Sequence, residues 1–241
     1  MNKSLKPLLG ISYVIILFIF LYLIFSYIEI TRLDDFLYYK ELQTDLEKTI
    51  GANFYKNLFI FFLFCLVWIS MLGFGSPLLI ISGILFGKWI GTFISVLSIS
   101  TGSLILYLIA SFFFKDLIYN LLNKKFSKFI NLFRKNEFNY FLAFRLAGGL
   151  GIPFGIQNIL PVIFNIKKSN YFFGSFLGFI PLFFIWNSIG SGLNQYIKQS
   201  DEFSFISLFF NKDIYTPIIL FLVVMLISFI IKKRIFNDKN K

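Results

Sequence analysis

Histidine is absent from the 241-residue chain, and cysteine occurs once, at Cys65. The lack of histidine excludes imidazole-based acid–base catalysis and, with a single cysteine, the usual Cys/His zinc sites. One cysteine also excludes a disulfide framework. Cys65 lies in an apolar run, which favours a small core residue over a nucleophile. No paired intramembrane carboxylates and no nucleophile–base spacing stand out, so we expect no enzyme, no cofactor and no metal.

Charged residues are also scarce, at 15% of the chain, against about a quarter in soluble domains. Hydrophobic residues make up 57%, phenylalanine alone occurs 36 times, and the mean hydropathy is +0.77. A soluble domain of this size has too small an interior for so much apolar surface. The composition therefore predicts an all-α integral membrane protein.

Four apolar runs are long enough to cross a hydrocarbon core of about 30 Å. They are residues 8–28, 90–114, 171–193 and 213–231. The first run ends without a small-x-small cleavage site, so we expect an uncleaved anchor. The polar segment 29–56 repeats its apolar residues at threes and fours, which predicts an amphipathic helix outside the bilayer.

Two further apolar stretches, 57–87 and 138–166, are interrupted by glycine and proline. The hairpin break in the first stretch is assigned to Gly75, Ser76 and Pro77. The net charges of segments 1–7, 29–56, 115–137, 194–213 and 232–241 are +2, −2, +4, −1 and +4. The positive-inside rule then places both termini in the cytoplasm. That topology requires each interrupted stretch to return to its side of entry, which predicts two opposed re-entrant hairpins.

The two halves of this region superpose without a gap at an offset of 76 residues. Three pairs match: Pro77 with Pro153, Ser98 with Gly174, and Gly102 with Gly178. Since the hairpins enter from opposite faces, the halves form a predicted inverted repeat, as in many secondary transporters. The predicted organisation is an N-terminal anchor and external segment (1–56), a membrane domain (57–193), and an external loop, last helix and basic tail (194–241).

The interrupted stretches and the helices after them contain a glycine-rich Pro-Leu arm, a hairpin arginine and a Pro-x-x-x-x-Asn spacing. The residues concerned are the segment 74–87, Gly91, Gly102, Ala143, Phe144, Arg145, Ile152, Pro153, Asn158, Gly178 and Pro181. Over roughly residues 57–193 this pattern resembles the DedA/VTT-domain superfamily, the SNARE-associated Golgi proteins. The resemblance implies a polytopic protein that moves or scrambles phospholipids or polyprenyl-phosphate lipids for envelope homeostasis.

The first hairpin differs from that of DedA proper, whose motif there is similar to Pro-Gly-Asp/Glu. This chain has Gly75-Ser76-Pro77-Leu78 at that place. No acidic residue occurs between Glu47 and Asp116, so the hairpin lacks a proton-coupling carboxylate. The pattern is closer to the wider VTT branch.

Arg145 is the candidate binding residue, because a charged side chain inside an apolar segment is costly and a guanidinium binds phosphate through paired hydrogen bonds. The alternative is that Arg145 snorkels to the headgroups. The other predicted substrate-binding residues are Gly148, Gly149, Gly151, Pro153 and Asn158. Asn158 could instead bridge the hairpin arms, and the glycines could simply form the turn. Ser98, Gly102, Gly174 and Gly178 are predicted helix-packing positions.

The expected partners are membrane lipids with anionic headgroups, and the basic residues flanking apolar spans give no nucleic-acid signature. Residue usage rich in Phe, Ile, Lys and Asn is typical of an AT-rich bacterial genome, and the expected location is the bacterial plasma (inner) membrane, which the chain would cross several times. The alternative function is a non-transporting membrane scaffold. Its basic helix 115–137, with Lys124, Lys125 and Lys128, would recruit lipids or partners.

Overall fold

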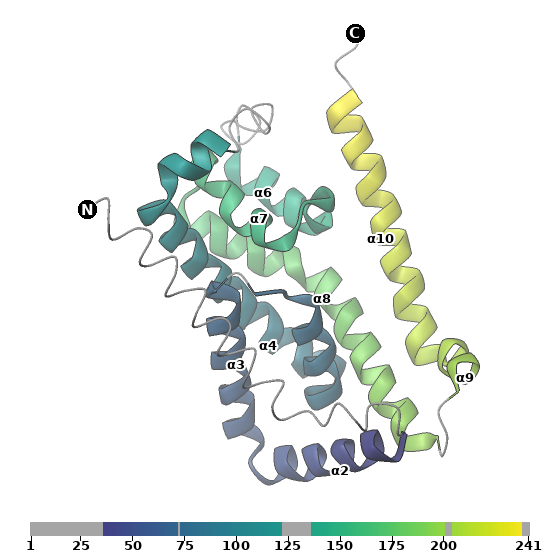
Figure 1. Ribbon diagram of the computed structural model, residues 1–241. Helices are drawn as coiled ribbons and strands as arrows, with labels where there is room; N and C mark the ends of the chain where they lie inside the picture. The colour runs from purple at the N-terminus through teal and green to yellow at the C-terminus, as the bar shows by residue number, and fades with distance from the viewer. Residues whose placement is uncertain (1–35, 72, 122–135, 201–203, 238–241) are drawn as a thin grey trace. The chain divides into compact units, whose positions relative to one another are not determined.

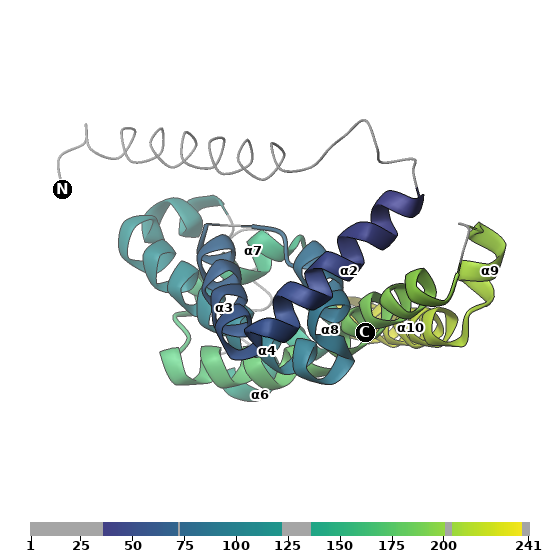
Figure 2. The same ribbon diagram turned by 90° about the horizontal axis from the view of Figure 1, so that it is seen from below.

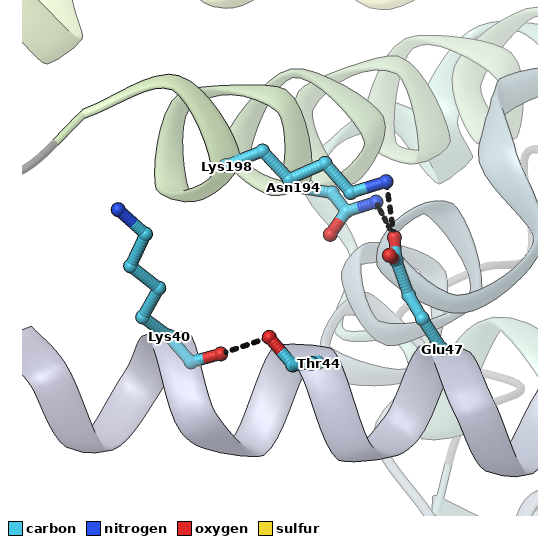
Figure 3. Close-up of polar contacts among 5 residues, drawn as sticks. All are labelled: Lys40, Thr44, Glu47, Asn194 and Lys198. Atoms are coloured by element: carbon cyan, nitrogen blue, oxygen red, sulfur yellow. Dashed lines mark hydrogen bonds and ion pairs between the residues drawn. The ribbon is translucent and has the colours of Figure 1, made fainter.

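The computed structural model describes residues 36–71, 73–121, 136–200 and 204–237, and these residues form helices and turns without β-strands. Contacts divide the chain into two compact units, 1–45 and 46–241. The described part of the first unit is the beginning of α2 (Phe36–Ala52), where the Thr44 hydroxyl donates to the Lys40 carbonyl at 2.8 Å (Figure 3). The other described helices lie in the second unit.

Two predictions fall outside the described residues. They are the first span, 8–28, and the lysines of the basic helix, Lys124, Lys125 and Lys128. The amphipathic helix predicted within 29–56 corresponds to α2.

The first interrupted stretch forms α3 (Phe54–Ser70) and the beginning of α4 (Ser76–Phe113). α4 is broken at Gly87, whose φ of 72° and ψ of 171° suit glycine and almost no other residue. The Phe86 ring lies 6.0 Å from the Phe54 ring and 5.3 Å from the Phe61 ring, so the segment 76–86 runs back along α3. α3 and this segment form the first helical hairpin (Figure 2).

The turn of the first hairpin precedes Ser76, at the start of the segment 75–77 assigned to the break. Ser76 and Pro77 already belong to the returning helix, in its first turn. Proline is tolerated there because the first amides of a helix have no intrahelical acceptor. Gly75 remains at the turn as the residue before the helix.

The second interrupted stretch forms α6 (Glu137–Leu146), the short 3₁₀ turn η2 (Gly148–Gly151), α7 (Phe154–Ile159) and η3 (Leu160–Phe164). Its two ends meet, because the Lys167 amide donates to the Glu137 carboxylate at 3.0 Å. Asn170 donates to the same oxygen at 2.5 Å. Residues 137–167 therefore form a second helical hairpin.

The helix α8 (Lys168–Gln199) follows the second hairpin and packs along α4. Figure 1 shows α8 as the green helix leading from the α6–α7 region toward α9. Among the described residues, α4 and α8 are each long and apolar enough to cross a membrane alone. α2 and α3 would supply a third span only if counted together across a bend of 108°. The described residues are thus all-helical, with two or three apolar helices that could span a membrane.

Each hairpin packs its first helix against a glycine of the long helix that follows. A methyl group added to Gly102 would lie 3.0 Å from Cβ of Ile69 in α3. A methyl group added to Gly178 would collide with Cβ of Arg145 in α6. Gly178 and Arg145 follow Gly102 and Ile69 by 76 residues in each case, so the two contacts occupy equivalent positions.

A second pair of contacts repeats at the same offset, one helical turn earlier. The side chains of Ser98 and Cys65 are both fully buried and interact with each other. A methyl group added to Gly174 would lie 2.8 Å from Cδ1 of Phe141. Gly174 and Phe141 again follow Ser98 and Cys65 by 76 residues. The long helix in each half thus meets its own hairpin in the same register.

After α8 the chain forms α9 (Phe205–Phe210) and α10 (Lys212–Asn237), which contains the predicted apolar run 213–231. α8 continues through Gln199, six residues beyond its predicted end. At this end of α8, Glu47 accepts from Asn194 at 3.3 Å and pairs with Lys198 at 2.5 Å (Figure 3). Both side chains of the ion pair are close to half exposed, so we expect it to contribute little to stability.

Candidate functional site

Arg145 lies in the last turn of α6 and is the largest fully buried side chain among the described residues, at 1% exposure. It forms no ion pair with any carboxylate of the described residues. The guanidinium therefore does not snorkel to the surface. It is held inside the second hairpin as a positive charge without a described counter-ion, an arrangement that usually marks function in a membrane segment.

Polar side chains of the hairpin and of α8 satisfy part of this guanidinium. Nη2 donates to Oδ1 of Asn158 at 2.9 Å and to the Tyr171 hydroxyl at 3.0 Å. Nη1 reaches Oε1 of Gln157 at 3.5 Å, which is long for a hydrogen bond. Nε is buried and has no hydrogen-bond partner. Neutral oxygen atoms of Asn158 and Tyr171 thus accept hydrogen bonds from one side of the guanidinium, and its Nε–H donates to no described group.

Aromatic rings surround the rest of the guanidinium. Its Cζ atom lies 4.7 Å from the centre of the Phe179 ring, 4.9 Å from Phe141 and 5.5 Å from Tyr171. The electron-rich face of a ring attracts a cation at such distances, more strongly where water is excluded. The rings offset part of the cost of burying the charge, although none of them supplies a negative charge.

Gln157 connects the turn of the second hairpin to this cluster. Its Nε2 donates to the carbonyl oxygens of Gly148, at 3.2 Å, and Ile152, at 2.6 Å. A methyl group on Gly149 would collide with the Gln157 amide, and Gly149 has a φ of +72°. Leu150 shares the left-handed conformation, with a φ of 57°, although it is not glycine. The turn is consequently tight and strained, and the Gln157 amide holds its backbone from inside the hairpin.

Tyr171 joins three parts of the fold. Its hydroxyl accepts from Arg145 and donates to the Asn158 carbonyl at 3.1 Å. Its ring stacks on Tyr107 of α4, with 4.7 Å between centroids. The Tyr107 hydroxyl in turn donates to the carbonyl of Ile166, at the end of the second hairpin, at 2.7 Å. These contacts couple the position of the arginine to both long helices.

The structure brings some of the predicted binding residues together and leaves others apart. Arg145 and Asn158 are in direct contact, and Gly149 packs on Gln157 beside them. Gly151 and Pro153 are exposed on the turn.

Gln157 and Tyr171 belong to the cluster and were not predicted from the sequence. The only available signal for Gln157 was its place beside Asn158. Tyr171 lies 26 residues from Arg145, and no sequence spacing relates the two.

The tips of the two hairpins are in contact with each other. A methyl group added to Gly75 would lie 3.7 Å from the ring of Phe154, the first residue of α7. The Phe154 ring also packs on Phe179 at 6.0 Å, and Phe179 covers Arg145 at 4.7 Å. The contact between the tips is therefore one aromatic ring away from the buried cation.

This arrangement suits anion binding better than bond-breaking chemistry. A guanidinium with an unused Nε–H matches the oxygens of a phosphate or carboxylate group. Within the described part of the chain, no group of three or more His, Cys, Asp or Glu residues could hold a metal ion.

A family model, described as the VTT domain, covers residues 73–192. The matched region begins at the tip of the first hairpin and includes α4, the second hairpin and most of α8. No solved structure matches the chain. With the match covering the tip contact, both long helices and the buried arginine, this chain belongs to the VTT-domain family.

Proposed function

We propose that this protein moves or scrambles phosphate-bearing lipids, phospholipids or polyprenyl phosphates, across the plasma membrane of a bacterium. The observation that carries the proposal is Arg145, a buried cation without a described carboxylate beside it and with an unused Nε–H donor. A lipid phosphate would supply the missing negative charge. No other class of membrane ligand fits a guanidinium as closely as a phosphate or carboxylate does.

In the proposed topology the two hairpins are re-entrant and enter from opposite faces as an inverted repeat. The repeated contacts of Gly102 with Ile69 and of Gly178 with Arg145 support it. α4 beyond Gly87, α8, α10 and the run 8–28 are the four spans. We include α10 because residues 214–231 contain no charged side chain. Both termini are then cytoplasmic, as the charge distribution indicates.

The described conformation is closed, since Arg145 is 1% exposed. Transfer therefore requires the second hairpin to open, and the turn at 148–151 is the proposed hinge. Four consecutive residues there have positive φ, and the Gln157 amide donates from the returning arm to two carbonyl groups of the turn, those of Gly148 and Ile152. Such short segments commonly absorb the backbone rotation of an opening movement. A headgroup phosphate would then replace Asn158 and Gln157 at the guanidinium.

The proposal is tested by linking the hairpin tips. Gly75→Cys and Phe154→Cys are introduced together in a Cys65→Ala background, and a short, reducible bis-thiol reagent joins them. We expect linkage to slow lipid transfer in proteoliposomes at least about tenfold, because it holds the second hairpin in its closed position against the first; reduction restores transfer. The two single-cysteine proteins, treated identically, are the controls. Unchanged transfer in fully linked protein would contradict an opening movement of the second hairpin.

A further inference from the structure

A separate cavity lies at the other end of α8, away from Arg145. It has a volume of about 220 Å³, is partly open, and is lined by the start of α4 beyond Gly87, the last turns of α8 and the first turns of α10. α8 and α10 approach closely beside it, since a methyl group on Gly192 would lie 2.6 Å from the Asp213 carbonyl oxygen. The cavity belongs to no part of the arginine cluster.

Two lysines dominate the lining of this cavity. Lys88, directly after the Gly87 break, and Lys212, the first residue of α10, both line it. Neither forms an ion pair with a carboxylate of the described residues. Asp213 lines the same cavity and is likewise without an ion pair there. Two lysines and one aspartate leave a net charge of +1, which a singly charged phosphodiester would neutralise.

Neutral polar residues also line the cavity, namely Ser191, Gln195 and Thr216. Ser188 lines it as well, but its hydroxyl already donates to the Phe184 carbonyl at 2.7 Å and can offer only an acceptor. The two lysine ammonium groups are donors only, and hydroxyl and amide groups can donate beside them, which suits an anionic ligand with several oxygens.

The position of the cavity indicates a ligand that comes from the membrane surface. Trp89, next to Lys88, is 71% exposed, and its ring lies 4.9 Å from Phe184. Exposed tryptophans of membrane proteins concentrate at headgroup depth. Phe184, which lines the cavity, and Leu220 form its apolar side, so the site borders both polar and acyl regions.

We propose that this cavity binds the phosphate of an anionic phospholipid headgroup between Lys88 and Lys212. Its volume is below the range of about 300–1,000 Å³ typical of pockets that enclose a drug-sized ligand. It therefore suits a headgroup whose acyl chains remain in the bilayer. The site deepens the proposed function and rests on it for the assignment of a lipid as the ligand. Lys88 is then a binding residue, beyond the interfacial anchor that its sequence neighbourhood indicates.

The test measures binding without transfer. Purified full-length protein in detergent is titrated with short-chain phosphatidylglycerol, and bound lipid is counted by native mass spectrometry. We expect the double variant Lys88→Gln/Lys212→Gln to bind at least about tenfold more weakly than the unaltered protein. Lys168→Gln, which removes an exposed lysine at the opposite end of α8, is the matched control and should bind normally.

A variant that is expected to bind more tightly distinguishes a lost binding site from a misfolded protein. Asp213→Asn removes the one negative charge of the cavity, so we expect it to bind phosphatidylglycerol more tightly, a result that unfolding cannot produce. Equal affinity in the unaltered protein, the double variant and Asp213→Asn would overturn the site.

Inorganic phosphate in tenfold excess distinguishes the two sources of the ligand. No displacement supports a lipid headgroup, whereas full displacement overturns that assignment in favour of free phosphate. Arg145→Gln separates the two proposals. This variant should lose lipid transfer and still bind phosphatidylglycerol at the cavity. If the cavity binds no lipid, the proposed transfer function can therefore still be tested separately.

Discussion

Arg145→Ala is expected to reduce lipid headgroup transfer in proteoliposomes by about ten- to a hundredfold, because charge-assisted hydrogen bonds contribute about 1.5–3 kcal/mol each. The substitution removes the only buried cation among the described residues of the second hairpin. It also leaves the Asn158 Oδ1 atom and the Tyr171 hydroxyl without their shared donor. Initial transfer rates at matched protein content in the vesicles measure the effect.

Two further variants separate the charge from the packing. Arg145→Gln keeps an amide donor for Asn158 without the charge, and Arg145→Lys keeps the charge without the planar donor edge. We expect glutamine to fold and to lose transfer, and lysine to retain part of it. If the glutamine protein transfers lipid as fast as the unaltered protein, the arginine only connects the hairpin arms, and its assignment to phosphate fails.

Gly190→Ala is expected to lower the free energy of unfolding in detergent by about 1–3 kcal/mol, the usual cost of overpacking a core. A methyl group at Gly190 would collide with the Ile80 carbonyl and lie 3.1 Å from Cα of Gly83. A methyl group at Gly83 would collide in turn with the backbone of Asn187. These neighbours are backbone atoms, which cannot rotate away, so the returning arm of the first hairpin must separate from α8.

Helix propensity predicts the opposite sign, which makes this substitution informative. Alanine in place of glycine within a helix gains about 1 kcal/mol when nothing else changes. Gly51→Ala is the matched control, because an added methyl group there meets no atom within 4 Å. We expect Gly51→Ala to be neutral or slightly stabilising. A stabilising Gly190→Ala would show that the first hairpin and α8 are not in backbone contact.

Local signals were sufficient for much of the architecture. Glycine and proline placed the interruptions near 73–77 and 148–153, and the structure turns the chain back at both. The apolar runs 90–114 and 171–193 correspond to the two long helices. The offset of 76 residues also relates Gly102 and Gly178, which contact equivalent positions in their hairpins. These features depend on backbone chemistry and hydropathy, and both can be seen in a sequence.

Contacts between distant segments were not accessible in this way. Tyr171 reaches Arg145 because α8 folds back on the second hairpin, and the stacking of Tyr107 on Tyr171 requires α4 beside both. The extension of α8 through Gln199 crosses a polar sequence. The cavity at Lys88 depends on the approach of α8 and α10, whose glycine contact has no sequence signature. Tertiary packing decides each of these.

The two halves of the repeat carry different residues at one equivalent position, where the first helix of each hairpin packs against the following long helix. Ile69 and Arg145 occupy matching positions against Gly102 and Gly178. In the first half this position is an apolar contact, whereas in the second it carries a buried charge held by Asn158 and Tyr171. A repeat that served packing alone would have no use for the charge, since arginine inside a membrane domain is costly. The asymmetry therefore supports assigning ligand binding to the second hairpin.

The central claim is that the protein moves lipid. The most direct measurement reconstitutes the unaltered protein into vesicles with a fluorescent phospholipid in both leaflets and adds a quencher that cannot cross the membrane. If the protein moves lipid, quenching proceeds beyond the outer-leaflet share, at a rate that rises with protein content and falls in Arg145→Gln. Quenching that stops at the outer-leaflet share in sealed, protein-containing vesicles would contradict the claim.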